Sequence, residues 1–341
     1  MANHRFPFHR IFPIFLSLLA ACNFPGVQPP LPTDISTTPL PTSTPVSTAP
    51  LGTVENPIVL AAIPSKDLAI SESAQSVAAQ LSELTGLAIV PAATATYKEL
   101  VAALGAGRVH IAVLPPLAYL LAHENGSADA ALEITQSGRD LGAVEFLVNT
   151  RLVGENKFRV YFDPATDSNL AEATSALKQF EDMKPCWTDE TSAVGYVLPF
   201  GLLLENKIPT RTGAFLRGDS AVVKSLYLDP GGDICQFGAA LADSRAALAS
   251  EYPDVNEKVV IVWRSEPLVP FDGIAFAASL PGDARISITA AFLSLLQTEA
   301  GRAALRDGYQ ITELKLVDDT LYAALRHALE QSGLDLETLV H

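Results

Sequence analysis

Histidine is scarce in this sequence, and the six residues that it holds are spread along the chain. Two lie within the first ten residues and one is the last residue, which leaves His110, His123 and His327 for chemistry inside a folded domain. None of the three stands at metal-ligand spacing from another histidine or cysteine, and there is no Gly-x-Ser-x-Gly elbow. The sequence therefore predicts no catalytic residue, no metal site and no cofactor. His110 lies in an apolar stretch and is predicted to be a buried core residue.

Basic residues are also few, since 23 lysines and arginines stand against 38 acidic residues and give a formal net charge of -15. Nucleic acids and anionic lipid head groups both require a basic surface. The composition therefore excludes nucleic-acid binding and excludes docking on a membrane by surface charge. Hydrophobic residues make up 48% of the chain, enough to build the core of one large or two small domains.

Long apolar runs are missing as well. The longest candidate, residues 11–21, follows a basic start and is too short for a bilayer, which needs about 20 apolar residues. It ends in Leu19-Ala20-Ala21-Cys22, which resembles a bacterial lipobox and predicts a signal peptide over 1–21 with Cys22 as the lipid-bearing residue. The alternative is an ordinary signal peptide with a chance cysteine. Either way, the sequence predicts an extracytoplasmic protein, and the lipobox anchors it to the cell membrane.

The segment after Cys22 has almost no charge and no large apolar residues in a regular pattern. Residues 23–54 hold eight prolines and ten Ser/Thr, with Asp34 as the single charge. Such a stretch buries too little apolar surface to offset the entropy of ordering, and proline favours an extended chain. Residues 22–54 are therefore predicted to be a lipidated tether.

From residue 55 onward, apolar strand-like runs alternate with helical patterns, which predicts an α/β fold with mostly parallel strands. A capping-box spacing, Thr96-x-x-Glu99, marks one helix start. The pattern restarts after Arg151 and returns near 264–270. We therefore expect two lobes joined by two crossovers. The predicted parts are the first part of lobe 1, lobe 2, and the return to lobe 1 with C-terminal helices, over 55–150, 151–265 and 266–341.

Small hydroxyl residues precede the apolar helix predicted near residues 194–205. Thr191 and Ser192 could cap its N-terminus, where unsatisfied amides and a partial positive charge favour an anion. The pattern alone leaves a second interpretation open, in which one of the two residues caps the helix and binds nothing.

The segment Thr-Ser-Ala-Val-Gly-Tyr-Val-Leu-Pro at 191–199 resembles the Ser-x-Ser-Gly-Tyr-x-x-Pro stretch of the phosphonate and phosphite substrate-binding proteins of ABC importers. Segments 97–119, 262–270 and 299–302 resemble the same family in order and spacing. The resemblance implies a two-lobed, type II periplasmic-binding-protein-like fold, with mixed sheets flanked by helices and a hinge of two crossovers. It also implies a small phosphorus oxyanion as ligand, an ABC permease as partner, a monomeric state and no enzymatic activity.

The resemblance further implies a ligand pocket between the lobes. Its residues in this sequence would be Thr191, Ser192, Gly195 and Tyr196 in the second lobe, with Tyr97 and Tyr119 in the first. Tyrosine can donate a hydrogen bond to an oxyanion while its ring packs against the protein. For Tyr97, the alternative is a plain core aromatic.

Two departures from the family pattern bear on the ligand. A Gly-x-His-Asp stretch is replaced by Arg217-Gly-Asp-Ser, so the histidine donor is missing, and the acidic residue that pairs with an ammonium group falls near Cys235. We therefore expect no gain in affinity from an amino group on the ligand, whereas Arg217 or Arg264 could add a bidentate contact to an oxyanion.

The alternative function is that of a sensor or structural lipoprotein, or of a binder of another small solute. The sequence leaves open whether Cys186 and Cys235 form a disulfide.

Overall fold

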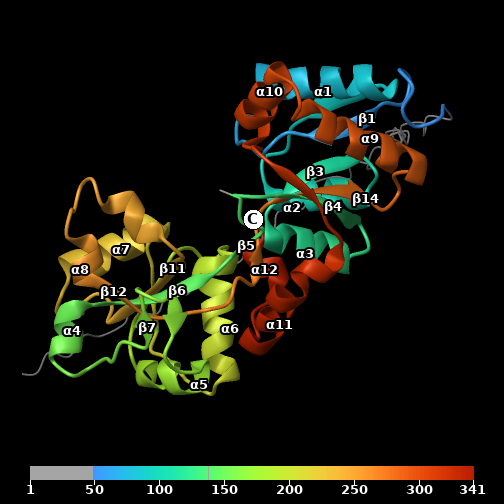
Figure 1. Cartoon of the computed structure of the whole chain (residues 1–341). Coiled ribbons are helices and arrows are strands. Elements are labelled where there is room, and N and C mark those ends of the chain that lie inside the picture. The colour runs from blue at the N-terminus through green and yellow to red at the C-terminus, as the bar shows by residue number, and fades with distance from the viewer. Residues whose placement is uncertain (1–48, 137) are drawn as a thin grey trace, which may run out of the picture. The chain divides into compact units, whose positions relative to one another are not determined.

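The computed structural model describes residues 49–136 and 138–341 (Figure 1). The predicted signal peptide, Cys22 and most of the predicted tether lie outside the described residues. The last part of the tether is folded, because the Gly52 amide donates to the Asn56 carbonyl and the Ala88 amide donates to the Gly52 carbonyl. The compact part of the chain therefore begins before residue 55, which is the start that the sequence predicts.

Six strands form the first sheet, in the order β15-β4-β14-β3-β1-β2. The β1–β2 and β1–β3 pairs are parallel, and β14 runs antiparallel to β3 and β4. The strands are β1 (Ile58–Ala61), β2 (Ile89–Ala92), β3 (Ile111–Leu114), β4 (Ala128–Ile134), β14 (Gly273–Ala277) and β15 (Leu314–Leu316).

Helices cover both faces of this sheet (Figure 1). Ile111 and Val113 of β3 pack on one side with α1 (Glu72–Thr85), α9 (Gly282–Leu295) and α10 (Glu299–Tyr309). Alternate residues Ala112 and Leu114 pack on the other side, as the two-residue period of a strand requires. That side carries α2 (Tyr97–Gly105) and α3 (Pro116–Glu124).

The helix start predicted at Thr96 is confirmed, since the Glu99 amide donates to the Thr96 hydroxyl at 3.1 Å. The Glu99 carboxylate accepts from the Ala95 amide at 2.9 Å, one residue before the amide that a capping box would use. His110 is buried, as predicted, and its Nδ1 accepts from the Val59 amide at 3.0 Å.

Five strands form the second sheet, in the order β10-β9-β11-β6-β12. Its strands are β6 (Val144–Asn149), β9 (Pro185–Trp187), β10 (Ala214–Phe215), β11 (Phe237–Leu241) and β12 (Val259–Arg264). The run 144–149 was assigned to the first lobe by sequence, but it is a fully buried strand of the second sheet. A strand buried on both faces has the same apolar pattern in either sheet, so its sequence cannot reveal which sheet it joins.

The two sheets are joined by a short antiparallel pair, β5 (Leu141–Gly142) with β13 (Val269–Pro270). The first crossover therefore precedes β6 rather than lying near Arg151, whereas the second lies within 264–270. The Val144 amide donates to the Ser265 hydroxyl at 3.0 Å, which ties the two crossovers together where they enter the second lobe. This arrangement is the two-lobed α/β fold with mixed sheets that the resemblance implies. The prediction of mostly parallel strands is wrong, because β14 and β15 in the first sheet and β6 in the second form only antiparallel pairs.

The remaining elements are short or lie at the ends of the lobes. These elements are α4 (Thr150–Gly154), β7 (Phe162–Asp163), β8 (Ser168–Asn169), α5 (Ala173–Ala176), η1 (Leu177–Phe180), η2 (Ala193–Val197), α6 (Leu198–Glu205), α7 (Asp219–Leu228), η3 (Ser244–Leu248), α8 (Val255–Lys258), η4 (Asp319–Tyr322), α11 (Ala323–Ser332) and α12 (Leu336–Leu339).

The C-terminal helix α11 lies beside α6 of the second lobe (Figure 1). A Cβ added at Gly201 of α6 would stand 2.3 Å from the Ala328 carbonyl oxygen, so glycine allows the two helices to approach closely. The chain then returns to the first lobe, where the Tyr97 amide donates to the His341 carbonyl at 2.8 Å.

Cys186 and Cys235 form a disulfide with a Cα–Cα distance of 5.5 Å, which settles the question left open by their spacing. Among residues 49–136 and 138–341, no helix is long and apolar enough to cross a bilayer.

Candidate functional site

The predicted anion site begins with Ser192, which caps the helix formed by the π-helical turn η2 and by α6. Its Oγ accepts from the Gly195 amide at 2.9 Å, and its carbonyl accepts from the Tyr196 and Val197 amides. The cap leaves the amides of Ala193 and Val194 as first-turn donors. The Ser192 hydroxyl uses a lone pair in the cap, so its proton remains available to an oxyanion.

Thr191 is exposed, and its polar groups are already engaged. Asp189 Oδ1 accepts from the Thr191 amide at 3.0 Å and from the Thr191 hydroxyl at 2.8 Å. In this conformation a carboxylate of the chain itself takes the donors that the sequence assigned to a ligand. Glu190 follows Asp189, so two acidic residues precede the helix.

Gly195 and Tyr196 follow Ser192 in the same turn. A Cβ added at Gly195 would lie 2.0 Å from Thr188 Oγ1, so only glycine fits this turn. The Tyr196 ring is half-buried against Phe200 and Phe215, with ring centroids 5.5 and 4.9 Å away. Burial, and then the nearby charge of Glu190, raise the pKa of Tyr196. Its hydroxyl therefore stays protonated and can act as a donor.

The two first-lobe tyrosines differ. Tyr119 is 1% exposed, and its hydroxyl donates to Asp319 Oδ1 at 3.1 Å, so it is a core residue with a committed donor. Burial and then Asp319 raise its pKa. Tyr97 is half-buried, and burial together with Asp272 raises the pKa of Tyr97 to about 12. Of the two, Tyr97 has the more available hydroxyl.

The N-terminus of η2 lies at the hinge. A Cβ added at Gly142 of β5 would stand 2.9 Å from Leu241 at the end of β11, 3.4 Å from Val194 and 3.6 Å from Phe271. Phe271 is followed by Asp272, whose charge contributes to the raised pKa of Tyr97. Val194 takes the place of the second serine in the motif Ser-x-Ser-Gly-Tyr-x-x-Pro. Its side chain packs on the hinge and supplies no hydroxyl.

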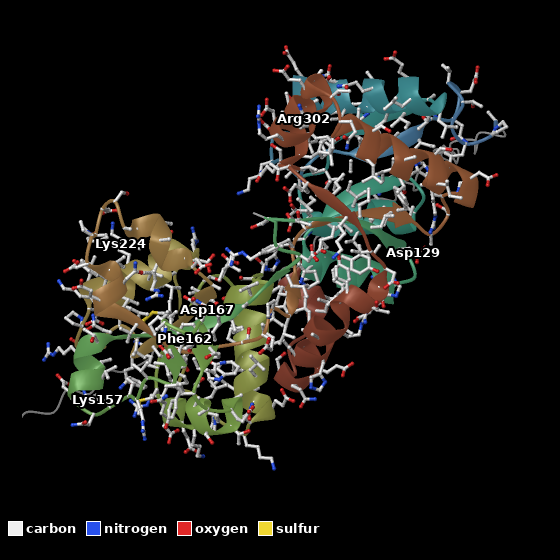
Figure 2. All side chains as sticks on the ribbon, viewed as in Figure 1. Asp129, Lys157, Phe162, Asp167, Lys224 and Arg302 are labelled. Atoms are coloured by element: carbon white, nitrogen blue, oxygen red, sulfur yellow. A yellow bond between two sulfur atoms is a disulfide. The ribbon has the colours of Figure 1, made fainter. Side chains whose placement is uncertain are left out.

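Arg264 is fully engaged and cannot bind a ligand as the sequence allowed. Its Nη2 donates to Glu145 Oε1 at 2.7 Å, its Nη1 donates to Asp167 Oδ1 at 2.6 Å, and its guanidinium lies over the Phe162 ring. Figure 2 labels Asp167 and Phe162 in the second lobe. Burial raises the pKa of Glu145, and the hydrogen bonds from Arg264 oppose that rise. This cluster supports β6 and β12 from within the second lobe.

A cavity of about 950 Å³ borders this cluster, and Arg139, Trp263, Arg264 and Leu268 are among its lining residues. Arg264 lines this cavity, whereas the predicted pocket residues Thr191, Ser192, Gly195, Tyr196, Tyr97 and Tyr119 do not.

Cys235 lies before β11, whereas the site lies at the other end of that strand. β9 and β11 are parallel, with Gly238 opposite Cys186, so Thr188 and Leu241 both leave the sheet at the edge that carries Ser192. Cys235 is bound in the disulfide and lies away from this edge, so it offers no charge to an ammonium group at the proposed site. Asp243 follows β11 at the edge of the sheet that carries Ser192, and its carboxylate pairs with Arg139 at 2.9 Å.

One side chain at this edge was missed by sequence reasoning. Thr188 directly follows β9, is 3% exposed, and its buried Oγ1 has no hydrogen-bond partner in the described part of the chain. Its only sequence signal is its position three residues before the hydroxyl pair.

Two α/β lobes joined by a paired hinge, with a capped helix N-terminus beside that hinge, define a two-lobed solute-binding protein. The family model described as "ABC transporter, phosphonate, periplasmic substrate-binding protein" matches residues 60–322, and the chain belongs to that family. Its members are solute-binding components of transporters and are not enzymes.

Solved structures show the same fold. XAC2383 from Xanthomonas citri bound to ATP is 16% identical, with a TM-score of 0.60 over 81% of this chain and 96% of that chain. PhnD1 from Prochlorococcus marinus in complex with methylphosphonate is 12% identical, with a TM-score of 0.53 over 81% of this chain and 98% of that chain. No curated protein matches the sequence.

Proposed function

We propose that this protein is a lipid-anchored, extracytoplasmic receptor that captures a phosphorus oxyanion between its lobes and delivers it to an ABC permease. The observation that carries the proposal is the capped N-terminus of η2 and α6 at the hinge, in a chain of the phosphonate-binding family. The ligand would be a phosphonate, phosphite or phosphate. Closure of the lobes about β5 and β13 would enclose it.

Four groups form the proposed oxyanion site in the second lobe. These are the Ser192 hydroxyl, the amides of Ala193 and Val194, and the Tyr196 hydroxyl. Tyr97 would add a donor from the first lobe. The net charge of -15 does not oppose this, because the Debye length is about 8 Å at physiological salt and distant carboxylates are screened.

The Ser192→Ala variant tests the proposal. A hydrogen bond to a charged group contributes about 1.5 to 3 kcal/mol, so affinity for the oxyanion should fall roughly ten- to a hundredfold in isothermal titration calorimetry. The loss of the bond to the Gly195 amide should lower stability by about 1 kcal/mol. A destabilised variant with unchanged affinity would make Ser192 a structural cap.

A second candidate is the binding of another small solute on the same fold. Val194 in place of the second serine, and the Asp189 carboxylate on the Thr191 donors, favour it. A sensor or structural lipoprotein would share these features. A thermal-shift screen separates the candidates, because phosphorus oxyanions should raise the melting temperature only if the first is right.

The anchor is tested by Cys22→Ala. We expect the variant to be released from the membrane fraction or to remain unprocessed, because the lipobox cysteine carries the acyl chains. Fractionation and the mass of the mature chain measure both. Membrane association and maturation like those of the unsubstituted protein would contradict the lipobox interpretation.

A further inference from the structure

Thr188 is an unusual core residue. A buried hydroxyl normally finds a partner, because burying an unpaired polar group costs free energy. Thr188 is 3% exposed and its Oγ1 has no partner in the described part of the chain. Its backbone is well held, since the Thr188 amide donates to the Gly195 carbonyl and the Thr188 carbonyl accepts from the Arg217 and Gly218 amides.

The Thr188 side chain packs against the first turn of η2. A Cβ added at Gly195 would come within 2.0 Å of Thr188 Oγ1, so the hydroxyl lies against the first turn of the helix. A helix N-terminus carries a partial positive charge and favours an anion. The unpartnered hydroxyl is therefore a second polar group beside the first turn of η2, next to Gly195.

Arg217 leaves the sheet beside Thr188. β10 runs parallel to β9 with Phe215 opposite Trp187, so Arg217 and Asp189, each two residues further on, follow the sheet at the same edge. The Arg217 amide donates to the Thr188 carbonyl at 2.5 Å. Its φ of 61° is a left-handed conformation that costs free energy in a residue with a side chain, and such positions cluster at functional sites.

The Arg217 side chain is exposed, and in residues 49–136 and 138–341 it takes part in no ion pair. Several other arginines are paired with carboxylates, for example Arg264 with Glu145, Arg285 with Asp129 and Arg326 with Asp319. The acidic residues near this edge, Asp189 and Glu190, would repel an oxyanion, and an arginine beside them offsets that charge.

We propose that Arg217 and Thr188 complete the oxyanion site. The Arg217 guanidinium binds two oxygens of the ligand as a fork, and the Thr188 hydroxyl donates to the oxygen held at the start of η2. This inference rests on the proposed function and names the residues that set its preference for a tetrahedral oxyanion. The guanidinium supplies the donor that the missing histidine of Gly-x-His-Asp would have supplied.

The experiment is titration calorimetry of the full mature chain with methylphosphonate, together with melting temperatures of the unliganded proteins. Arg217→Gln should weaken binding at least tenfold, and Arg217→Lys should lie between it and the unsubstituted protein, because lysine keeps the charge and loses the fork. Arg211→Gln, an equal charge change at the other end of β10, should leave affinity unchanged.

Thr188→Val separates binding from structure. Valine has the same shape without the hydroxyl, so affinity should fall while the melting temperature stays equal or rises, because an unpartnered polar group has been removed. The inference is overturned if the unsubstituted protein binds methylphosphonate and Arg217→Gln behaves like Arg211→Gln, or if Thr188→Val lowers the melting temperature with unchanged affinity. If the unsubstituted protein binds no phosphorus oxyanion, the proposed function fails and the inference fails with it.

Discussion

Replacing Cys186 and Cys235 together by alanine should lower the free energy of unfolding by about 4 kcal/mol. The disulfide closes a loop of sequence separation 49, and the chain entropy that it removes from the unfolded state scales with the logarithm of that length. Both cysteines are buried, at 0% and 1% exposure, so the alanines also leave a small cavity. Urea unfolding measures the change, with a larger m-value expected because the unfolded chain is less compact.

The Cys22→Ala variant is the matched control, because it removes a cysteine that lies outside this bridge. Its unfolding should match that of the unsubstituted chain, and thiol reduction should destabilise both proteins while leaving the double-alanine variant unchanged. A loss of stability below about 1 kcal/mol in the double variant would contradict a stabilising disulfide between β9 and the segment before β11.

Glu133→Gln should make the protein more stable above neutral pH. Glu133 is 0% exposed in β4, and neither carboxylate oxygen has a hydrogen-bond partner in the described residues. Burial raises its pKa to about 7, and the nearby Phe271 amide and Lys315 partly oppose that rise. The group therefore binds a proton more tightly in the folded state than in the unfolded chain, where the pKa is near 4.5.

The sign of the pH dependence follows from this difference. Below pH 4.5 the carboxyl is protonated in both the folded and the unfolded chain, so it does not lower the free energy of unfolding. As the pH rises from 4.5 through 7, the unfolded chain loses the proton first, and the free energy of unfolding falls. The loss reaches about 3 kcal/mol above pH 8, from roughly 1.4 kcal/mol for each unit of pKa difference. Glutamine cannot ionise, so the variant should lack this slope and should differ little from the unsubstituted protein near pH 4. Melting temperatures from pH 4 to pH 9 measure both effects.

Glu145→Gln provides the contrasting control. Glu145 is equally buried, but it accepts two hydrogen bonds from Arg264, so removing its charge leaves a largely buried guanidinium without its main partner. That variant should be destabilised at pH 8, where Glu133→Gln is stabilised. A Glu133→Gln protein that is less stable than the unsubstituted one at pH 8 would show that the Glu133 charge is favourable.

The architecture could be predicted where sequence patterns are local. The helices near residues 74–84 and 100–104 show apolar residues at helical spacing, and Thr96 with Glu99 marks a start that the structure confirms. The strand β4 was not predicted, because Ala-Asp-Ala-Ala at its start has no strand pattern. Its extension depends on pairing with β14 and β15, which come much later in the chain.

The site could be predicted only in part, for a related reason. Ser192 is a helix cap that can be identified from neighbouring residues, and Gly195 and Tyr196 follow it in the same turn. Thr188 and Arg217 come together only because β9 and β10 pair, which the sequence does not specify. Tyr119 looked like a ligand-binding tyrosine, yet its hydroxyl bonds to Asp319, 200 residues away.

Calorimetry of the mature chain with methylphosphonate, phosphite and phosphate decides whether this protein is a phosphorus-oxyanion receptor. We expect at least one of the three to bind at a single site. At one hundred times its dissociation constant, that ligand should add about 2.7 kcal/mol to the free energy of unfolding. Binding of none of the three, together with a clear thermal shift from a solute of another class, would contradict the oxyanion function while leaving the family fold intact.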